Sequence, residues 1–182
     1  TPNRHFRKEP RVFVAADGMH FTTHDGRQVI DGISSLWCVG AGHNRKPINE
    51  AIKRQLDTLD YATAFQASND QAFAAAERIA ALAPGDLNKV LFCNSGSEAA
   101  DTSLKLALAY HRARGEGHRN VFIGREKGYH GVGFGGMSVG GIPANRKVFG
   151  TALLPRVDHL PFIHDPVNHA YIHGALPEWQ TD

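Results

Sequence analysis

The sequence contains only two cysteines, Cys38 and Cys93, in 182 residues. They stand far apart and form neither a disulfide scaffold nor a paired zinc-ligand spacing, which favours free thiols in a reducing compartment. No apolar run approaches the roughly 20 residues that a membrane-spanning helix needs. The first residues also lack the charged-then-apolar pattern of a secretory signal. These absences predict a cytoplasmic protein without a membrane partner.

Long runs of one charge are absent as well. The 20 basic and 18 acidic side chains give a formal net charge of +2 and are spread along the chain. A nucleic-acid-binding surface usually shows as a basic run or stripe, so the charge pattern favours small molecules over nucleic acid as partners. An apolar share of 42% is enough for a globular core.

The turn at residues 95–97 is the most informative part of the sequence. An apolar run at residues 90–93 precedes it and helical spacing follows, which predicts a strand, a tight turn and a helix beginning near Ser97. Ser95 and Glu98 have the spacing of a capping box. The unpaired N–H groups of a helix start, a glycine and two hydroxyls suit a phosphate group. An ordinary capped helix packed on a sheet explains these residues equally well.

The first part of the chain predicts antiparallel strands followed by helices. A strand is expected at residues 12–15, and a hairpin at residues 19–31 around Asp25-Gly26. Helical spacing follows at residues 47–60, with proline at a first helical position, and again at residues 70–82, where Asp70 is the expected cap.

Two irregular segments interrupt this pattern. Residues 32–43 combine glycines with Trp37, and loops of that kind often carry binding residues, although a tryptophan that fills a gap in the core is an equal alternative. Residues 61–69 carry two aromatic side chains, Tyr61 and Phe65, among small residues. They either line a pocket or cover apolar surface, and the second interpretation is slightly favoured.

A second apolar run, residues 121–124, follows the long helix. Two such runs separated by a helix predict a βαβ unit with parallel strands buried on both faces, and therefore an α/β fold. In such sheets ligands collect beyond the carboxyl ends of the strands, where residues 95–97 and 125–131 would converge. Tyr129 and His130 lie in the second of these segments, although a surface tyrosine and histidine explain them as well.

Two further patterns are rejected. Six glycines between residues 131 and 141 resemble a dinucleotide loop, but no strand directly precedes them and no acidic residue follows at the expected spacing. Several histidines and aspartates near the end of the chain invite a metal site: Asp158, His159, His164, Asp165, His169 and His173. Prolines interrupt this stretch and no glutamate accompanies the histidines, so we expect no metal.

Several motifs taken together resemble the class III aminotransferases. They are Leu36-Trp37-Cys38, Ala41-Gly42-His43, Asn94-Ser95-Gly96-Ser97-Glu98-Ala99, Tyr129-His130-Gly131 and Val139-Gly140-Gly141. The resemblance runs from about Arg4 to the end of the chain, and within the class it is closest to the ω-amino acid:pyruvate (β-alanine:pyruvate) aminotransferase group. The serine-glycine-serine turn and the downstream Tyr-His-Gly are fairly specific as a pair.

The resemblance implies an α/β protein of fold-type I that uses pyridoxal 5′-phosphate (PLP) and works as a homodimer or a dimer of dimers. Residues 1–59 would contribute a β-hairpin to the small domain together with a linking helix. Residues 60–182 would form the first, incomplete part of the large three-layer α/β domain that binds PLP. The implied reaction moves an amino group from an ω-amino acid or amine, such as β-alanine, to pyruvate.

The resemblance also implies roles for individual residues. Those assigned to the cofactor are Ser95, Gly96, Ser97, Tyr129 and His130. Gly96 and Ser97 would hold the phosphate, and Tyr129 would stack on the pyridine ring. Trp37 would form a wall of the substrate pocket. Residues 61–66 are a candidate for reaching the pocket of the partner subunit.

Two groups that the family needs are missing from these residues: the aspartate that partners the ring nitrogen and the Schiff-base lysine. No lysine stands in the family's position, and Lys105 lies roughly 10 Å from the helix start. We therefore expect an N-terminal portion, trimmed at both ends, that is inactive alone. It should also be poorly soluble or partly unfolded, because apolar sheet edges lie open. The alternatives are another class III enzyme, such as an aminomutase or a different amine transaminase, and a non-catalytic α/β protein that binds a phosphorylated ligand.

Overall fold

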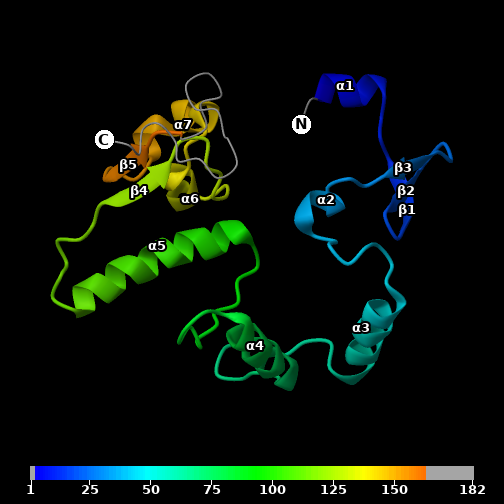
Figure 1. Ribbon diagram of the computed structural model, residues 1–182, viewed down its shortest axis with the longest axis horizontal. Coiled ribbons are helices and arrows are strands. Elements are labelled where there is room, and N and C mark those ends of the chain that lie inside the picture. The colour runs from blue at the N-terminus through cyan, green and yellow to red at the C-terminus, as the bar shows by residue number, and fades with distance from the viewer. Residues whose placement is uncertain (1–2, 163–182) are drawn as a thin grey trace, which may run out of the picture. The chain divides into compact units, whose positions relative to one another are not determined.

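The computed structural model describes residues 3–162, and the chain divides into two compact units, Thr1–Leu82 and Ala83–Asp182. Figure 1 shows the order of their helices and strands along the chain. The predicted division into residues 1–59 and 60–182 concerns the domains of a complete fold and stays a prediction. No helix in the described part of the chain is long and apolar enough to span a membrane.

A three-stranded antiparallel sheet is the main feature of the first unit. After helix α1 (Asn3–Lys8), strands β1 (Phe13–Asp17), β2 (His20–Thr23) and β3 (Gln28–Ile30) pair in the order β1-β2-β3. The predicted hairpin is confirmed, and Gly26 at its tip has a φ of +84°. The buried hydroxyl of Thr23 accepts a hydrogen bond from the N–H of Arg27 at 2.9 Å and so closes the turn.

Three helical segments complete the first unit: α2 (Ser34–Trp37), α3 (Lys46–Thr58) and α4 (Asp70–Leu82). The two longer helices confirm the helical spacing of the sequence. The predicted cap of α4 is wrong: Asn69 accepts from the N–H of Ala72 at 2.9 Å, whereas Asp70 accepts from the N–H of the next residue. A capping side chain reaches the N–H two or three residues ahead, and Asn69 has that spacing.

The second unit combines helices with a parallel strand pair. Its elements are α5 (Gly96–Ala113), β4 (Phe122–Arg125), α6 (Phe134–Val139), α7 (Pro143–Phe149), a 3-10 turn (Gly150–Ala152) and β5 (Val157–Leu160). Strand β4 runs parallel to β5, with Phe122 opposite Val157 and Arg125 opposite Leu160. Helix α6 contacts α5, α7 and both strands. These elements lie together in Figure 1.

The predicted βαβ unit of residues 90–93, the long helix and residues 121–124 is wrong for the described chain. Residues 90–93 form no strand, because no segment of the described chain pairs with them and a strand requires a hydrogen-bonded neighbour. The parallel partner of β4 is instead β5, reached through α6 and α7. The prediction that these strands are buried on both faces is also wrong within residues 3–162, because Ile123 in β4 is 66% exposed. The neighbouring Gly124 is buried, and a Cβ there would collide with the carbonyl of Val139, so α6 packs directly on the strand backbone.

Candidate functional site

The start of α5 is a variant of the predicted capping box, because the Glu98 carboxylate reaches the residue before the N-cap Ser95. The Ser95 hydroxyl accepts from the N–H of Glu98 at 3.1 Å, and the Glu98 carboxylate accepts from the N–H of Asn94 at 2.7 Å. The carbonyl of Ser95 accepts from the N–H of Ala99 at 3.0 Å. Within residues 3–162, the N–H group of Gly96 and that of the residue directly after it have no acceptor. Free N–H groups at the positive end of a helix attract an anion.

Ser97 joins this helix start to the loop that carries Tyr129 and His130. Its hydroxyl oxygen accepts from the N–H of Val132 at 3.0 Å, which leaves the hydroxyl proton free to donate to another group. The backbone of Gly131 has a φ of +109°, and a Cβ there would lie 2.6 Å from the Cα of Ser97. Only glycine lets the loop pass so close to α5. The predicted convergence of the two segments is therefore confirmed for Ser97 and Gly131.

Asp101, one turn further along α5, holds the start of α6. Its carboxylate accepts from the N–H of Gly136 at 2.6 Å. The N-cap residue of α6 is Gly133, which has no side chain to cap its own helix, so Asp101 caps α6 from a neighbouring helix. A Cβ at Gly133 or Gly135 would lie 2.5 or 2.8 Å from this carboxylate. The glycine-rich stretch thus serves close packing against α5, a role that sequence analysis missed.

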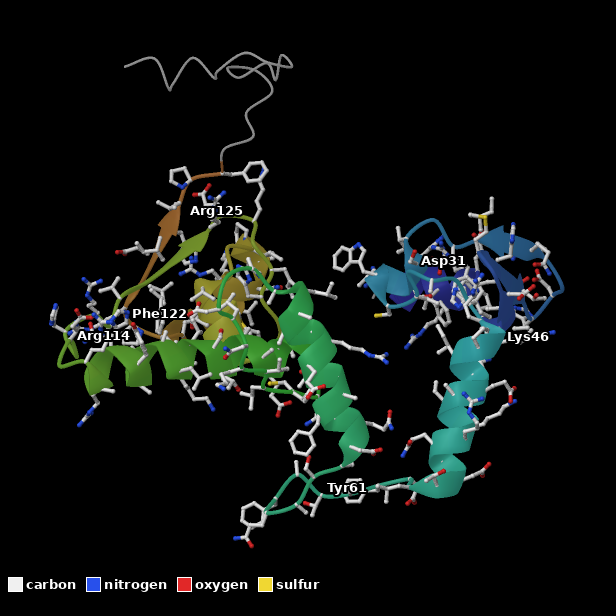
Figure 2. All side chains as sticks on the ribbon, turned by 60° about the horizontal axis from the view of Figure 1, so that its bottom comes forward. Asp31, Lys46, Tyr61, Arg114, Phe122 and Arg125 are labelled. Carbon is white, nitrogen blue, oxygen red and sulfur yellow. The ribbon has the colours of Figure 1, made fainter. Side chains whose placement is uncertain are left out.

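The two aromatic residues of the Tyr-His-Gly motif lie at the surface of this assembly. Tyr129 is 60% exposed. His130 lines a hollow of about 260 Å³ together with residues from α5, β4 and α6, among them Leu104 and Phe122. Figure 2 shows Phe122 and Arg125 at opposite ends of β4. The aromatic face of Tyr129 is therefore available for a contact, and its role in binding stays a prediction.

His159, one of the residues weighed as a metal ligand, is part of the scaffold. Its Nε2 lies 2.9 Å from the carbonyl oxygen of Gly140, which can only accept, so Nε2 carries the proton. Its Nδ1 then accepts from Arg146 at 3.1 Å. No cluster of three or more potential metal ligands occurs in residues 3–162. Four other residues weighed as metal ligands lie outside the described residues: His164, Asp165, His169 and His173.

In the first unit, Trp37 ends an unusual turn. Ser34, Ser35, Leu36 and Trp37 have φ values of 49°, 48°, 59° and 70°. Left-handed backbone costs an L-residue roughly 1–2 kcal/mol. The Trp37 side chain is 85% exposed, which excludes the core-filling alternative within the described part of the chain. The indole of Trp37 is therefore open to contact.

A buried carboxylate, which sequence analysis missed, holds this turn. One oxygen of Asp31 accepts from the N–H groups of Ser35 at 3.0 Å and Ile33 at 3.3 Å. The other accepts from the Ser35 hydroxyl at 3.1 Å and from Nε2 of His43 at 2.8 Å. The Ser35 N–H most of all, then His43, lowers the pKa of Asp31 to about 2 against the opposing effect of burial. Figure 2 shows Asp31 among the strands and the turn of this unit.

The aromatic segment after α3 is also open. Tyr61 is 76% and Phe65 is 81% exposed, so neither covers apolar surface within residues 3–162. Figure 2 shows Tyr61 in this irregular connection. The favoured interpretation of this segment as a simple cover is therefore wrong for the described chain, and the prediction that it reaches a partner subunit stays untested.

Comparison with known proteins identifies the family. The model of the class-III aminotransferase family matches residues 3–176. The chain belongs to the class III aminotransferases. Among curated members, an omega-aminotransferase of Caulobacter vibrioides is 55% identical, and a beta-alanine–pyruvate aminotransferase of Pseudomonas aeruginosa is 53% identical, each over 90% of this chain. The chain spans 37% and 36% of their lengths.

A solved transaminase structure supports the fold. The amine transaminase of an uncultivated Pseudomonas species, crystallised in the PLP-bound form, has a TM-score of 0.81 and 34% identity. The match covers 92% of this chain and 38% of that one. The predicted α/β, fold-type I class is therefore confirmed for a class III aminotransferase chain that spans just over a third of its relatives.

Proposed function

We propose that the complete protein carrying this chain is a PLP-dependent aminotransferase that moves an amino group from an ω-amino acid or amine, such as β-alanine, to pyruvate. The relatives named for an omega-aminotransferase and a beta-alanine–pyruvate aminotransferase support this substrate class. The observation that carries the proposal is the start of α5, where two N–H groups have no acceptor within residues 3–162 and the Ser97 hydroxyl proton is free to donate.

This helix start fits the phosphate of PLP. A Cβ at Gly96 would meet no atom within 4 Å, so a ligand has room to reach the backbone there. The N–H groups of Gly96 and Ser97 and the hydroxyl of Ser97 supply three donors, with Ser95 beside them. Each charge-assisted hydrogen bond to an anion contributes about 1.5–3 kcal/mol. The exposed ring of Tyr129 would orient the pyridine ring, and His130 would adjoin it.

The remaining roles need parts of the complete protein. PLP, when bound, supplies an electron sink, while the residues of this chain bind and orient it. The lysine that bonds PLP lies outside this chain, so the chain alone is inactive. Trp37 would form a wall of the amine pocket. The complete protein would form a homodimer or a dimer of dimers, in which the partner subunit would cover residues 61–66. The proposed compartment is the cytoplasm, and no nucleic-acid or membrane partner is proposed.

The test is covalent capture of the cofactor. The complete protein is incubated with PLP, reduced with borohydride and analysed by mass spectrometry after digestion. We expect a pyridoxyl adduct on one lysine beyond Asp182, together with transfer of an amino group from β-alanine to pyruvate. An adduct with a different donor preference would indicate another class III enzyme, and a complete protein without an adduct would support the non-catalytic alternative.

A further inference from the structure

We infer that Asp31 is a positioning residue for the amine pocket, because its carboxylate holds the left-handed turn Ser34–Trp37 and thereby sets the direction of the Trp37 indole. This inference rests on the proposed function, in which Trp37 forms a wall of that pocket. It concerns a residue that does not itself contact substrate or cofactor.

The turn needs an external hold. Its four residues all have positive φ values, and none of them is glycine. Three backbone hydrogen bonds close the turn. The N–H of Trp37 donates to the carbonyl of Ile33 and the N–H of Val39 to that of Ser34, both at 3.0 Å, and the N–H of Cys38 also donates to the carbonyl of Ser34. Consecutive left-handed residues are unfavourable for L-amino acids and persist where surrounding structure determines them.

Asp31 supplies that hold from inside the turn. Three donors of the turn, the N–H of Ile33 and the N–H and hydroxyl of Ser35, converge on its carboxylate at 3.0–3.3 Å. The Asp31 side chain is only 4% exposed, so water has little access to the carboxylate oxygens that accept these hydrogen bonds. A buried acceptor with several matched donors fixes one backbone conformation.

Asp31 is itself fixed by the sheet. Its N–H donates to the carbonyl of Met19 at 2.8 Å, next to the end of β3. His43, which donates to the carboxylate at 2.8 Å, is held by backbone hydrogen bonds with Gly18 of 2.7 and 3.2 Å. The ring of Phe21 in β2 lies 4.6 Å from the His43 ring. A continuous set of contacts therefore runs from the hairpin through His43 and Asp31 to the turn.

The backbone of the turn sets the position from which the indole projects. Trp37 is 85% exposed, so packing contributes little and the turn determines where its Cα–Cβ bond points. Weakening the hydrogen bonds of the Asp31 carboxylate should therefore move Trp37, the proposed wall of the pocket. The phosphate-binding residues belong to the other unit and should stay as they are.

The experiment uses the complete protein with Asp31→Asn, and with Ser35→Ala as a milder variant in case the first fails to fold. The matched control is Asp25→Asn, which removes a hydrogen-bonded carboxylate from the tip of the same hairpin. We expect Asp31→Asn to raise KM for the amine donor about tenfold or more, since small misplacement of a binding group has effects of that size. In Asp31→Asn, KM for pyruvate and the rate of cofactor release should change less than twofold. In Asp25→Asn, KM for the amine donor should also change less than twofold, because distant sites act independently.

The decisive comparison is made in a Trp37→Ala background. If Asp31 acts through Trp37, Asp31→Asn has no further effect on donor preference once the indole is gone. Equal effects with and without the indole, or an unchanged donor KM in Asp31→Asn, would overturn the inference.

A second readout does not depend on activity. With fluorotryptophan incorporated, the fluorine resonance assigned to Trp37 should shift or broaden in Asp31→Asn and stay unchanged in Asp25→Asn. An unmoved resonance contradicts the inference. A moved resonance in a protein without transaminase activity supports the positioning role and refutes the proposed function alone, so the two failures are distinguishable.

Discussion

Replacing Ser97 with alanine removes one donor of the proposed phosphate site and leaves the helix intact. The hydroxyl oxygen accepts from the N–H of Val132 at 3.0 Å, so its proton is directed elsewhere. A charge-assisted hydrogen bond to phosphate contributes about 1.5–3 kcal/mol. Since 1.4 kcal/mol corresponds to a factor of ten, the variant should bind PLP about 10- to 150-fold more weakly.

The assay measures PLP release from the complete protein during dialysis, followed by titration of the apoprotein with PLP. Ser103→Ala is the matched control, because Ser103 lies on the same helix and its hydroxyl donates to the carbonyl of Ala100 at 2.7 Å. The control should retain PLP like the unchanged protein. Equal PLP affinity in Ser97→Ala and Ser103→Ala would refute the phosphate role of Ser97.

Three further predictions concern Asp101, Gly131 and Asp31. Asp101→Ala should lower the free energy of unfolding by about 2–3 kcal/mol, because the N–H of Gly136 loses its charged acceptor, and a change below about 0.5 kcal/mol in urea unfolding would contradict this. Gly131→Ala should weaken PLP retention about tenfold or more, since its Cβ would lie 2.6 Å from Ser97 at a φ of +109°; normal retention would show that the loop is not needed there. The lowered pKa of Asp31, about 2 against a usual 3.8, contributes stability that is complete above about pH 4 and is lost as the pH falls toward 2. Asp31→Asn should therefore flatten the acid-unfolding profile between pH 4 and 2, and an unchanged profile would argue against this contribution.

Local features were predictable from the sequence. The capping box of Ser95 and Glu98 involves residues three apart, and the turn of the hairpin depends on Asp25-Gly26. Both are determined by neighbours in the chain, so spacing and residue type were sufficient. The meeting of Ser97 with the loop after Tyr129 was also expected, although the strand at residues 90–93 on which that expectation rested does not form in the described chain.

Features that depend on distant partners were not predictable. Strand β4 pairs with β5, and residues 90–93 have no partner in the described chain. The cap that Asp101 provides for α6 joins residues 35 positions apart. The contact between Asp31 and His43 depends on a bridge between Gly18 and His43 that has no local signal. Sequence spacing carries no information on such contacts, since folding of separate segments creates them.

A crystal structure of the complete protein with PLP tests the phosphate site most directly. We predict that the phosphate accepts hydrogen bonds from the N–H groups of Gly96 and Ser97, with the ring of Tyr129 against the pyridine ring. A phosphate bound away from the start of α5, with Tyr129 out of contact with the cofactor, would contradict it.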